Sequence, residues 1–574
     1  MVETMFTLMM PSARTTRLRV ARLPGDQTNC LTDLVWKQAL GTVLALVCGS
    51  AALTAETGRL VLWQADAVAA KLIAPRLEPP VEKLAETTIN GYLADCFGRE
   101  LPLARNAAGP GPFIVVGDET NNPVIERLVS GGLKLNRQAT GAEGFRILTH
   151  EAGERRFVVI TANSAAGLKH GCQELVFFRL AASAERGEVE WPLDVTMKPV
   201  FPYRGVYMLP CWSAQDSIEK WQRVLKFHSE LTLNRNWFWL AGFPLLPAFG
   251  GEYTNTALAE VRNVRGLVRL CREEAMKFYI GGGWYNWHHA KVIGGSVERG
   301  IQYYVDLVKL LPGTEGIYLE PAGEGSDIDP NLWRQRAEAL QTLAERVRQD
   351  DPDFEFAIAI GKFNAPAYRE AVHRIDDRHT YWWWCWGDPL RQNALAEHPL
   401  VLRWHTVVQM SDFHGSIDPP LPSERPLTGF ATSYDPGMGY GNPWNGWGKL
   451  GYDKPRNFHP HTLPYFSHQY RFREGCWDPG ITDAQFTARL ARRLFDADMP
   501  ADSVANYQQL SRLCFRPLEA KGEVIDSLDA FVSAHAGKGS ARNRDTLARM
   551  REALDGLRLT LEKERTRSSN GPAK

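Results

Sequence analysis

The sequence predicts an α/β protein with a central (β/α)8 barrel, an α+β domain before it and a helical region after it. Strand-like and helix-like segments alternate over roughly 230 residues, the size and order of such a barrel. The strand-like segments are nearly continuous apolar runs, as expected for parallel strands buried on both faces. At 574 residues, the chain is also too long for a single hydrophobic core.

The first 55 residues have the parts of a secretory signal. Lys37 precedes the apolar run 39–47, and small residues follow at 48–52. The run is too short to span a bilayer comfortably. We expect translation to start downstream of Met1, cleavage near Ala52 or Ala55, and a secreted or periplasmic protein with no membrane attachment. The alternative is an uncleaved, buried helix.

Residues 58–198 are expected to form the N-terminal α+β domain. Its helix carries apolar residues at helical spacing, and Asn163 or Ser164 can cap its start. The strands expected here are 112–117, 145–148 and 157–161, and the helix is 163–180.

Residues 199–480 are expected to form the barrel. A doubly wound open sheet is less favoured, because no glycine-rich G-x-G-x-x-G follows a strand. The eight strands expected are 204–208, 234–240, 277–280, 316–320, 354–360, 380–386, 402–410 and 427–433. The helices expected between them are 213–231, 257–275, 296–310, 331–348, 365–373 and a short one near 392.

Residues 481–564 are expected to be helical, and 565–574 a disordered polar tail. Thr482 or Asp483 can cap a helix that runs to Phe495. We expect these helices to pack on the barrel or on a second subunit, which would make a homodimer.

The amino-acid composition limits the kinds of molecule that the protein is expected to bind. The 66 Lys and Arg residues balance 66 Asp and Glu residues, which argues against nucleic-acid binding. The chain has 18 Trp against 17 Tyr, and flat indole faces suit sugar rings, although ordinary core Trp is the alternative. The Trp residues that fall at expected strand ends, and are therefore candidate substrate contacts, are Trp237, Trp239, Trp284, Trp287, Trp384, Trp386 and Trp404.

The loop after the fourth expected strand carries the sharpest catalytic candidate. Glu324 lies between two glycines just past the strand, and Glu320 lies at the strand end. A Glu kept protonated by an apolar site can donate a proton to a leaving oxygen. A solvated loop Glu is the alternative for Glu324, and Glu320 suits either an ion pair or a sugar hydroxyl. No histidine or cysteine spacing indicates a metal or another cofactor.

Several segments resemble the N-terminal domain shared by bacterial β-hexosaminidases (glycoside hydrolase family 20) and α-glucuronidases (family 67). In both families this domain precedes a catalytic barrel. The segments are Phe113-Ile-Val-Val-Gly117, Glu143-Gly-Phe-Arg-Ile147, Val158-Val-Ile-Thr-Ala-Asn163, Ala165-Ala-Gly-Leu-Lys-His-Gly171 and Phe201-Pro-Tyr-Arg-Gly205.

The barrel is more similar to the α-glucuronidases. Hexosaminidases carry an Asp directly before the acid Glu, and this chain has Gly323 there. The Gly-Glu-Gly context of Glu324 resembles the α-glucuronidase acid. Val408-Gln409, Ile417-Asp418 and Glu424 follow the order of that family's seventh-strand motifs, with altered spacing.

The resemblance implies a glycoside hydrolase acting on oligosaccharides or polysaccharide fragments, with Glu324 as general acid. Asp412, Asp418 and Glu424 are the candidates for the base. A uronic acid substrate also needs a cation for its carboxylate, and Arg204, Arg235 and Lys291 lie near expected strand ends. The alternatives are a β-N-acetylhexosaminidase-like hydrolase and a non-catalytic carbohydrate-binding protein.

Overall fold

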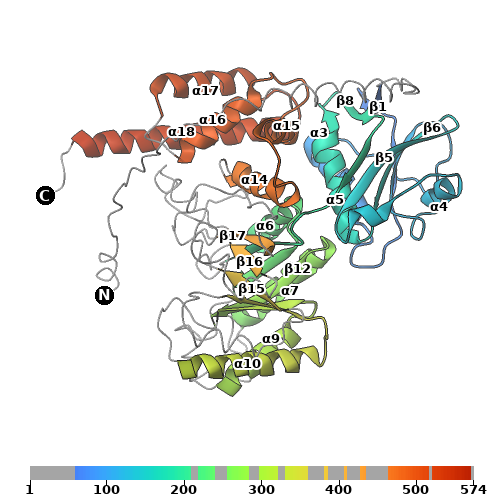
Figure 1. The fold of residues 1–574 in the computed structure, drawn as a ribbon. Helices are drawn as coiled ribbons and strands as arrows, with labels where there is room; N and C mark the ends of the chain where they lie inside the picture. The colour runs from blue at the N-terminus through green and yellow to red at the C-terminus, as the bar shows by residue number, and fades with distance from the viewer. Residues whose placement is uncertain are drawn as a thin grey trace, which may run out of the picture. The chain divides into compact units, whose positions relative to one another are not determined.

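The computed structural model describes residues 58–208, 218–239, 255–283, 297–320, 330–359, 380–384, 406–409, 427–434, 463, 465–515 and 520–569. The mixed α/β class is confirmed (Figure 1). The expected signal segment, the helix 365–373 and the helix near 392 lie outside these residues. Among the described helices, none combines the length and the apolar character needed to cross a membrane.

Two sheets form the N-terminal domain. One is antiparallel in the order β2-β1-β8-β7, and the other is mixed in the order β3-β4-β6-β5-β9. The antiparallel sheet comprises β1 (Gly58–Gln64), β2 (Ala67–Val68), β7 (Leu180–Ala182) and β8 (Arg186–Trp191). The mixed sheet comprises β3 (Lys71–Ile73), β4 (Pro112–Val116), β5 (Phe145–Ala152), β6 (Arg155–Ala162) and β9 (Asp194–Met197).

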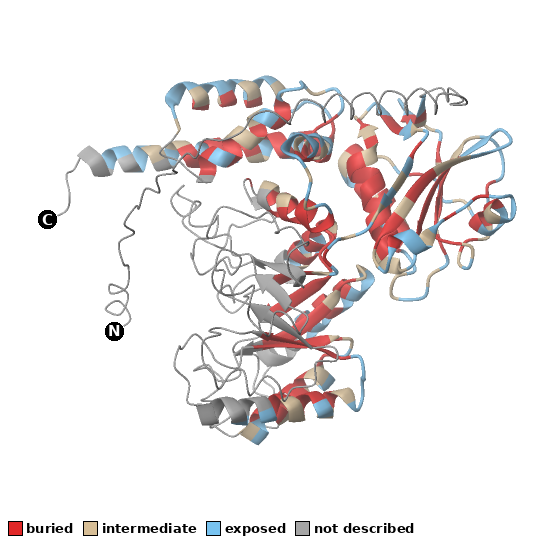
Figure 2. Ribbon diagram, viewed as in Figure 1, coloured by how far each residue is buried: buried red, intermediate tan, exposed pale blue. Residues whose placement is uncertain are grey.

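Along the chain, the helices of this domain alternate with its strands. Ser164 caps α5 (Ala165–Glu174) by accepting from the Gly167 amide at 3.1 Å, one of the two caps expected. Figure 2 shows α5 as almost wholly buried, because it packs on β5 and β6. The others are α2 (Leu84–Glu86), η1 (Thr87–Gly91), α3 (Tyr92–Phe97), α4 (Pro123–Ser130), η2 (Arg137–Thr140) and η3 (Leu175–Arg179).

Eight parallel strands form a closed barrel in chain order, β10 to β17. The last strand closes the barrel by pairing with the first, with Gly205 opposite Ala431. The strands are β10 (Tyr203–Met208), β11 (Arg235–Trp239), β12 (Lys277–Gly283), β13 (Gly316–Glu320), β14 (Glu355–Ala359), β15 (Thr380–Trp384), β16 (Thr406–Gln409) and β17 (Leu427–Tyr434).

Helices follow the first four strands. They are α6 (Ile218–Glu230), α7 (Asn255–Glu273), α9 (Val297–Leu310) and α10 (Pro330–Arg348), and α14 (Tyr465–Trp477) comes after β17. The outward strand residues Phe238, Phe278, Ile317 and Phe356 are buried in the core that these helices share. Strands and helices therefore alternate from β10 to α10, as the sequence predicts.

The C-terminal helices pack on the N-terminal domain. Thr482 caps α15 (Asp483–Leu494) through a capping box with Gln485. Arg489 of α15 donates to both carboxylate oxygens of the buried Glu174, at 2.9 and 2.7 Å. The remaining helices are α16 (Ser503–Phe515), α17 (Gly522–His535) and α18 (Ala541–Ser569). Helix α15 also contacts the barrel, because its Arg493 donates to Glu230 of α6 at 2.7 Å. Packing on the barrel is therefore confirmed, packing on the N-terminal domain was not expected, and a homodimer stays a prediction.

The prediction of a disordered tail over residues 565–574 is wrong for residues 565–569. Helix α18 continues from Ala541 to Ser569, well into the segment 565–574. Glu, Lys and Arg in that stretch are good helix formers, and the preceding turns of the helix already supply the nucleus.

A glycine in β10 makes room for a tryptophan in β11. A Cβ at Gly205 would lie 2.2 Å from the ring of Trp237, so a side chain there displaces the indole. We expect Gly205→Ala to destabilise the protein by about 1–3 kcal/mol. Gly266→Ala in α7 is the matched control, because a Cβ there would meet nothing within 4 Å and Ala favours helix. Thermal unfolding measures both, and equal melting temperatures would contradict this packing.

Candidate active site

The amino end of the barrel is closed by a charged cluster. Arg235 of β11 donates from Nε and Nη2 to the two carboxylate oxygens of Glu355 in β14, both at 3.2 Å. Lys277 and the hydroxyl of Tyr279 donate to the same carboxylate. Because β11 and β14 are not neighbours in the barrel wall, these bonds cross its interior. We call Arg235, Lys277, Tyr279 and Glu355 the floor cluster.

Aromatic rings fill the barrel above the floor cluster. Trp237, Tyr279 and Tyr318 are all fully buried, and the first two meet edge to face at 6.3 Å between ring centroids. A Cβ at Gly316 would lie 2.1 Å from the Tyr279 ring, so this glycine makes room for it. The amino end and the middle of the barrel are therefore packed among the described residues, and barrel enzymes bind their substrates at the carboxyl ends of the strands.

The carboxylate of the floor cluster makes the fold acid-sensitive. Burial raises the pKa of Glu355, but Arg235 and Lys277 outweigh it and lower that pKa from 4.5 to about 2. A lowered pKa in the folded state contributes stability that is complete above pH 4.5 and disappears as the pH falls towards 2. The difference is on the order of 3 kcal/mol.

Glu355→Gln should therefore lower the unfolding free energy at pH 7 and flatten its pH dependence below pH 4.5. Glu298→Gln is the control, since that side chain is 66% exposed and its ion pair with Arg346 is a surface one. Urea unfolding from acidic to neutral pH, read by fluorescence, measures both variants. If Glu355→Gln and wild type lose stability in parallel, another group causes the acid loss.

Glu324, the predicted general acid, follows β13 in the sequence. The last residue of that strand is Glu320, paired in register with Gly283 of β12. Trp239 and Trp384 are the last residues of β11 and β15, so their backbones lie at the same end of the barrel. The predicted residues outside the described part of the chain are Glu324, Asp412, Asp418, Glu424, Trp284, Trp287, Trp386 and Trp404.

The structure corrects the assignment of Trp237 to the substrate. Its side chain is 0% exposed and lies against Gly205 and Tyr279 inside the barrel. A ring without an exposed face cannot stack on a sugar. Trp237 instead belongs to the packed barrel interior.

The structure also corrects the assignment of Arg204. This side chain is 0% exposed and lies at the amino end of β10, opposite to the end where a substrate would bind. Its Nε donates to the Thr232 carbonyl and its Nη1 to the Phe201 carbonyl, each at 2.9 Å. Its Nη2 donates to Glu143 of the N-terminal domain at 2.5 Å. Arg204 therefore joins the barrel to that domain.

Arg235, the second cation considered for a uronate, is engaged in the floor cluster. Its guanidinium also lies 3.7 Å from the centroid of the Tyr203 ring. Both arginines lie at the amino ends of their strands, which in a parallel barrel meet at the end opposite to the one where a substrate binds. Lys291 lies outside the described residues.

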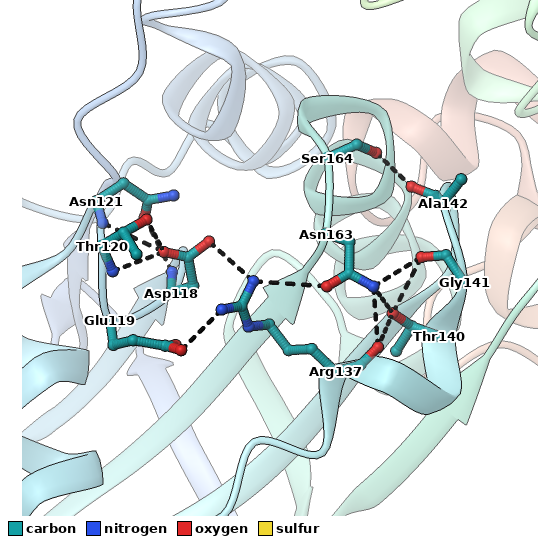
Figure 3. Close-up of polar contacts among 10 residues, drawn as sticks. All are labelled: Asp118, Glu119, Thr120, Asn121, Arg137, Thr140, Gly141, Ala142, Asn163 and Ser164. Atoms are coloured by element: carbon teal, nitrogen blue, oxygen red, sulfur yellow. Dashed lines mark hydrogen bonds and ion pairs between the residues drawn. The ribbon is translucent and has the colours of Figure 1, made fainter.

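Sequence reasoning missed a polar network in the N-terminal domain (Figure 3). Arg137 donates to Asp118 at 3.3 Å, to Glu119 at 2.8 Å and to Asn163 at 3.5 Å. Asn163 in turn donates to the Arg137 carbonyl at 3.0 Å. These bonds tie together the loops that follow β4 and β6, so the network stabilises the domain. Asn163 was considered only as a helix cap.

In the described part of the chain, no cluster of three or more His, Cys, Asp and Glu side chains could hold a metal ion. The acidic and basic groups of the floor cluster are paired with each other.

No protein-family model matches the chain, and neither does any curated protein. Solved structures do match. One is described as "Structure of CpGH84D", with a TM-score of 0.51 and 10% identity over 79% of this chain and 72% of the other. Another is a GH138 enzyme targeting pectin rhamnogalacturonan II, with a TM-score of 0.52 and 12% identity over 79% of this chain and 56% of the other.

A third match is a GH20 exo-β-N-acetylglucosaminidase from Vibrio harveyi in complex with N-acetylglucosamine. Its TM-score is 0.47 and its identity 11%, over 79% of this chain and 76% of the other. All three neighbours are glycoside hydrolases. At these identities the likeness in the first two concerns the fold.

Proposed function

We propose that the chain is a glycoside hydrolase on its closed eight-stranded barrel, with Glu324 as general acid. The observation that carries the proposal is the position of β13, which ends at Glu320 in a barrel whose opposite end is sealed. Glu324 follows four residues later in the sequence, beyond the carboxyl end of β13. The fold likeness to glycoside hydrolases supports the same reaction class.

Among substrates, we propose an α-linked uronic acid. Hydrolysis assisted by a substrate acetamide needs a carboxylate next to the acid to orient that acetamide, and Gly323 supplies none. A uronate needs a cation instead. With Arg204 and Arg235 both engaged at the amino ends of the strands, Lys291 is the remaining cation of the three.

The substrate test uses aryl glycosides that differ in one group: a glucuronide, an N-acetylglucosaminide and a glucoside. We expect the glucuronide to have the highest kcat/KM. Lys291→Met should raise KM for the glucuronide at least tenfold and leave the glucoside unchanged. A preference for the N-acetylglucosaminide, unaffected by Lys291→Met, would replace the uronide proposal with the hexosaminidase-like one.

The reaction mechanism is proposed to be inverting, with Asp412, Asp418 or Glu424 as base. An acid and a base separated by roughly 6.5–9.5 Å admit a water between base and sugar. Proton NMR of the first product formed reports the anomer directly. Retention of configuration would instead assign one of the three carboxylates as a nucleophile.

We further propose that the mature, exported chain begins near Ala52 to Glu56. Cleavage there leaves β1 intact, because that strand begins at Gly58. N-terminal sequencing of protein isolated from its own cells is expected to give a start in this range. A start upstream of Trp36 in a cytoplasmic fraction would contradict export.

A further inference from the structure

A pocket of about 250 Å³ lies under the barrel, on the amino side of the floor cluster. Arg235 and Lys277, the first residues of β11 and β12, line it together with Glu315, which directly precedes β13. Glu143 comes from the N-terminal domain, and Arg272 from the last turn of α7. The floor cluster and the rings above it lie between this pocket and the carboxyl ends of the barrel strands.

Three of its charged groups are already bonded within the protein. The carboxylate of Glu143 accepts from Arg204 at 2.5 Å and from Asn234 at 2.8 and 2.9 Å. Arg235 and Lys277 donate to Glu355. These bonds fix the pocket wall in place before any ligand binds.

The other two charged groups are uncommitted. No hydrogen bond or ion pair joins the Arg272 guanidinium to another described residue, and its side chain packs over Gly313, where a Cβ would lie 3.0 Å from its Cδ. Oε2 of Glu315 is buried with no hydrogen-bond partner among the described residues. Burial raises the pKa of Glu315, while Lys277 and Arg272 act in the opposite direction.

Charge and size limit what can fill the space between these two groups. Among the lining residues, the cations Arg235, Arg272 and Lys277 outnumber the carboxylates Glu143 and Glu315 by one. A monoanion balances that charge, whereas a neutral sugar leaves Arg272 unpaired and a phosphate dianion is repelled by Glu315. The volume corresponds to on the order of eight water molecules, which fits one small polar molecule.

We propose that this pocket binds a small hydroxylated carboxylate the size of a single sugar acid. The planar guanidinium of Arg272 takes the ligand carboxylate in a forked pair, with Lys277 nearby. A ligand hydroxyl donates to Glu315 Oε2, which satisfies that buried acceptor. The site is distinct from the proposed active site, because the sealed barrel interior lies between them.

The test is isothermal titration calorimetry of the whole protein with D-glucuronate, D-gluconate, D-glucose, acetate and inorganic phosphate. Both sugar acids should bind with at least tenfold higher affinity than the other three. Arg272→Gln should weaken sugar-acid binding at this site at least tenfold, and Glu315→Gln should narrow the difference between gluconate and acetate. Arg269→Gln is the matched control in the same helix, with a side chain that is 75% exposed.

Several outcomes would overturn the inference. They are the absence of saturable heat with either sugar acid, unchanged binding in Arg272→Gln, and phosphate or acetate binding as tightly as gluconate. Hydrolysis of aryl glycosides, measured on the same preparations, keeps this question separate from the proposed function. Arg272→Gln is expected to leave that rate unchanged, so loss of ligand binding and loss of catalysis are read independently.

Discussion

Replacing Glu324 by Gln is expected to slow hydrolysis of a glycoside with a poor leaving group by about 10²–10⁴-fold. Such a leaving oxygen departs only when it is protonated, and Gln cannot supply the proton. An activated aryl leaving group, such as dinitrophenolate, needs little protonation and should lose much less. Steady-state kinetics with the two substrates, on the wild type and the variant, give the comparison.

Glu298→Gln serves as the control, because it removes an exposed carboxylate from the surface of α9. It should leave both rates unchanged. Equal losses on the two substrates in Glu324→Gln would remove Glu324 from the role of acid and point to a structural or binding role.

Replacing Arg204 by Met is expected to destabilise the protein by about 3–5 kcal/mol. Met keeps much of the packing volume but leaves Glu143 without its cation. Burial raises the pKa of Glu143, and Arg204 is the main group that outweighs it and holds that pKa at about 2. The Thr232 and Phe201 carbonyls lose their donors as well.

Thermal and urea unfolding measure this loss, with Arg346→Met on the surface of α10 as the control. The control should change stability by less than about 1 kcal/mol. Well below its melting temperature, Arg204→Met should retain the wild-type KM for a glucuronide. A large rise in KM without loss of stability would restore Arg204 as a substrate ligand.

Strand positions in the barrel were predictable because each strand is a short, continuous apolar run bounded by polar residues. The run 316–320 was expected from Gly-Ile-Tyr-Leu-Glu, and β13 has those bounds. In the N-terminal domain, β9 was missed because its four residues, Asp194–Met197, are exposed or half-buried and carry no apolar run. Strand β2 has only two residues, too few for any periodicity.

The roles of Trp237 and Arg204 could not be predicted from local sequence patterns. Trp237 and Arg204 lie on strands that were correctly predicted, but their roles depend on three-dimensional position. The burial of Trp237 depends on its contacts with Gly205 and Tyr279 on the two neighbouring strands. The partner of Arg204, Glu143, lies 61 residues earlier in another domain, and no local pattern links the two.

Glu324 is a candidate because it lies between two glycines just past the fourth expected strand. The structure confirms that strand as β13, which ends at Glu320. Sequence patterns indicate no role for Glu315 or Arg272, because neither lies at the carboxyl end of a strand, where the chemistry of a barrel enzyme is expected.

The most direct test of the account is whether the purified protein cleaves a glycosidic bond or only binds sugars. Product release from aryl glycosides and xylan-derived oligosaccharides is followed by chromatography, alongside calorimetric titration of the same oligosaccharides. We expect release by the wild type and loss of release, with binding retained, in Glu324→Gln. Saturable binding of oligosaccharides with no product from any substrate would contradict it and identify a carbohydrate-binding protein on a barrel scaffold.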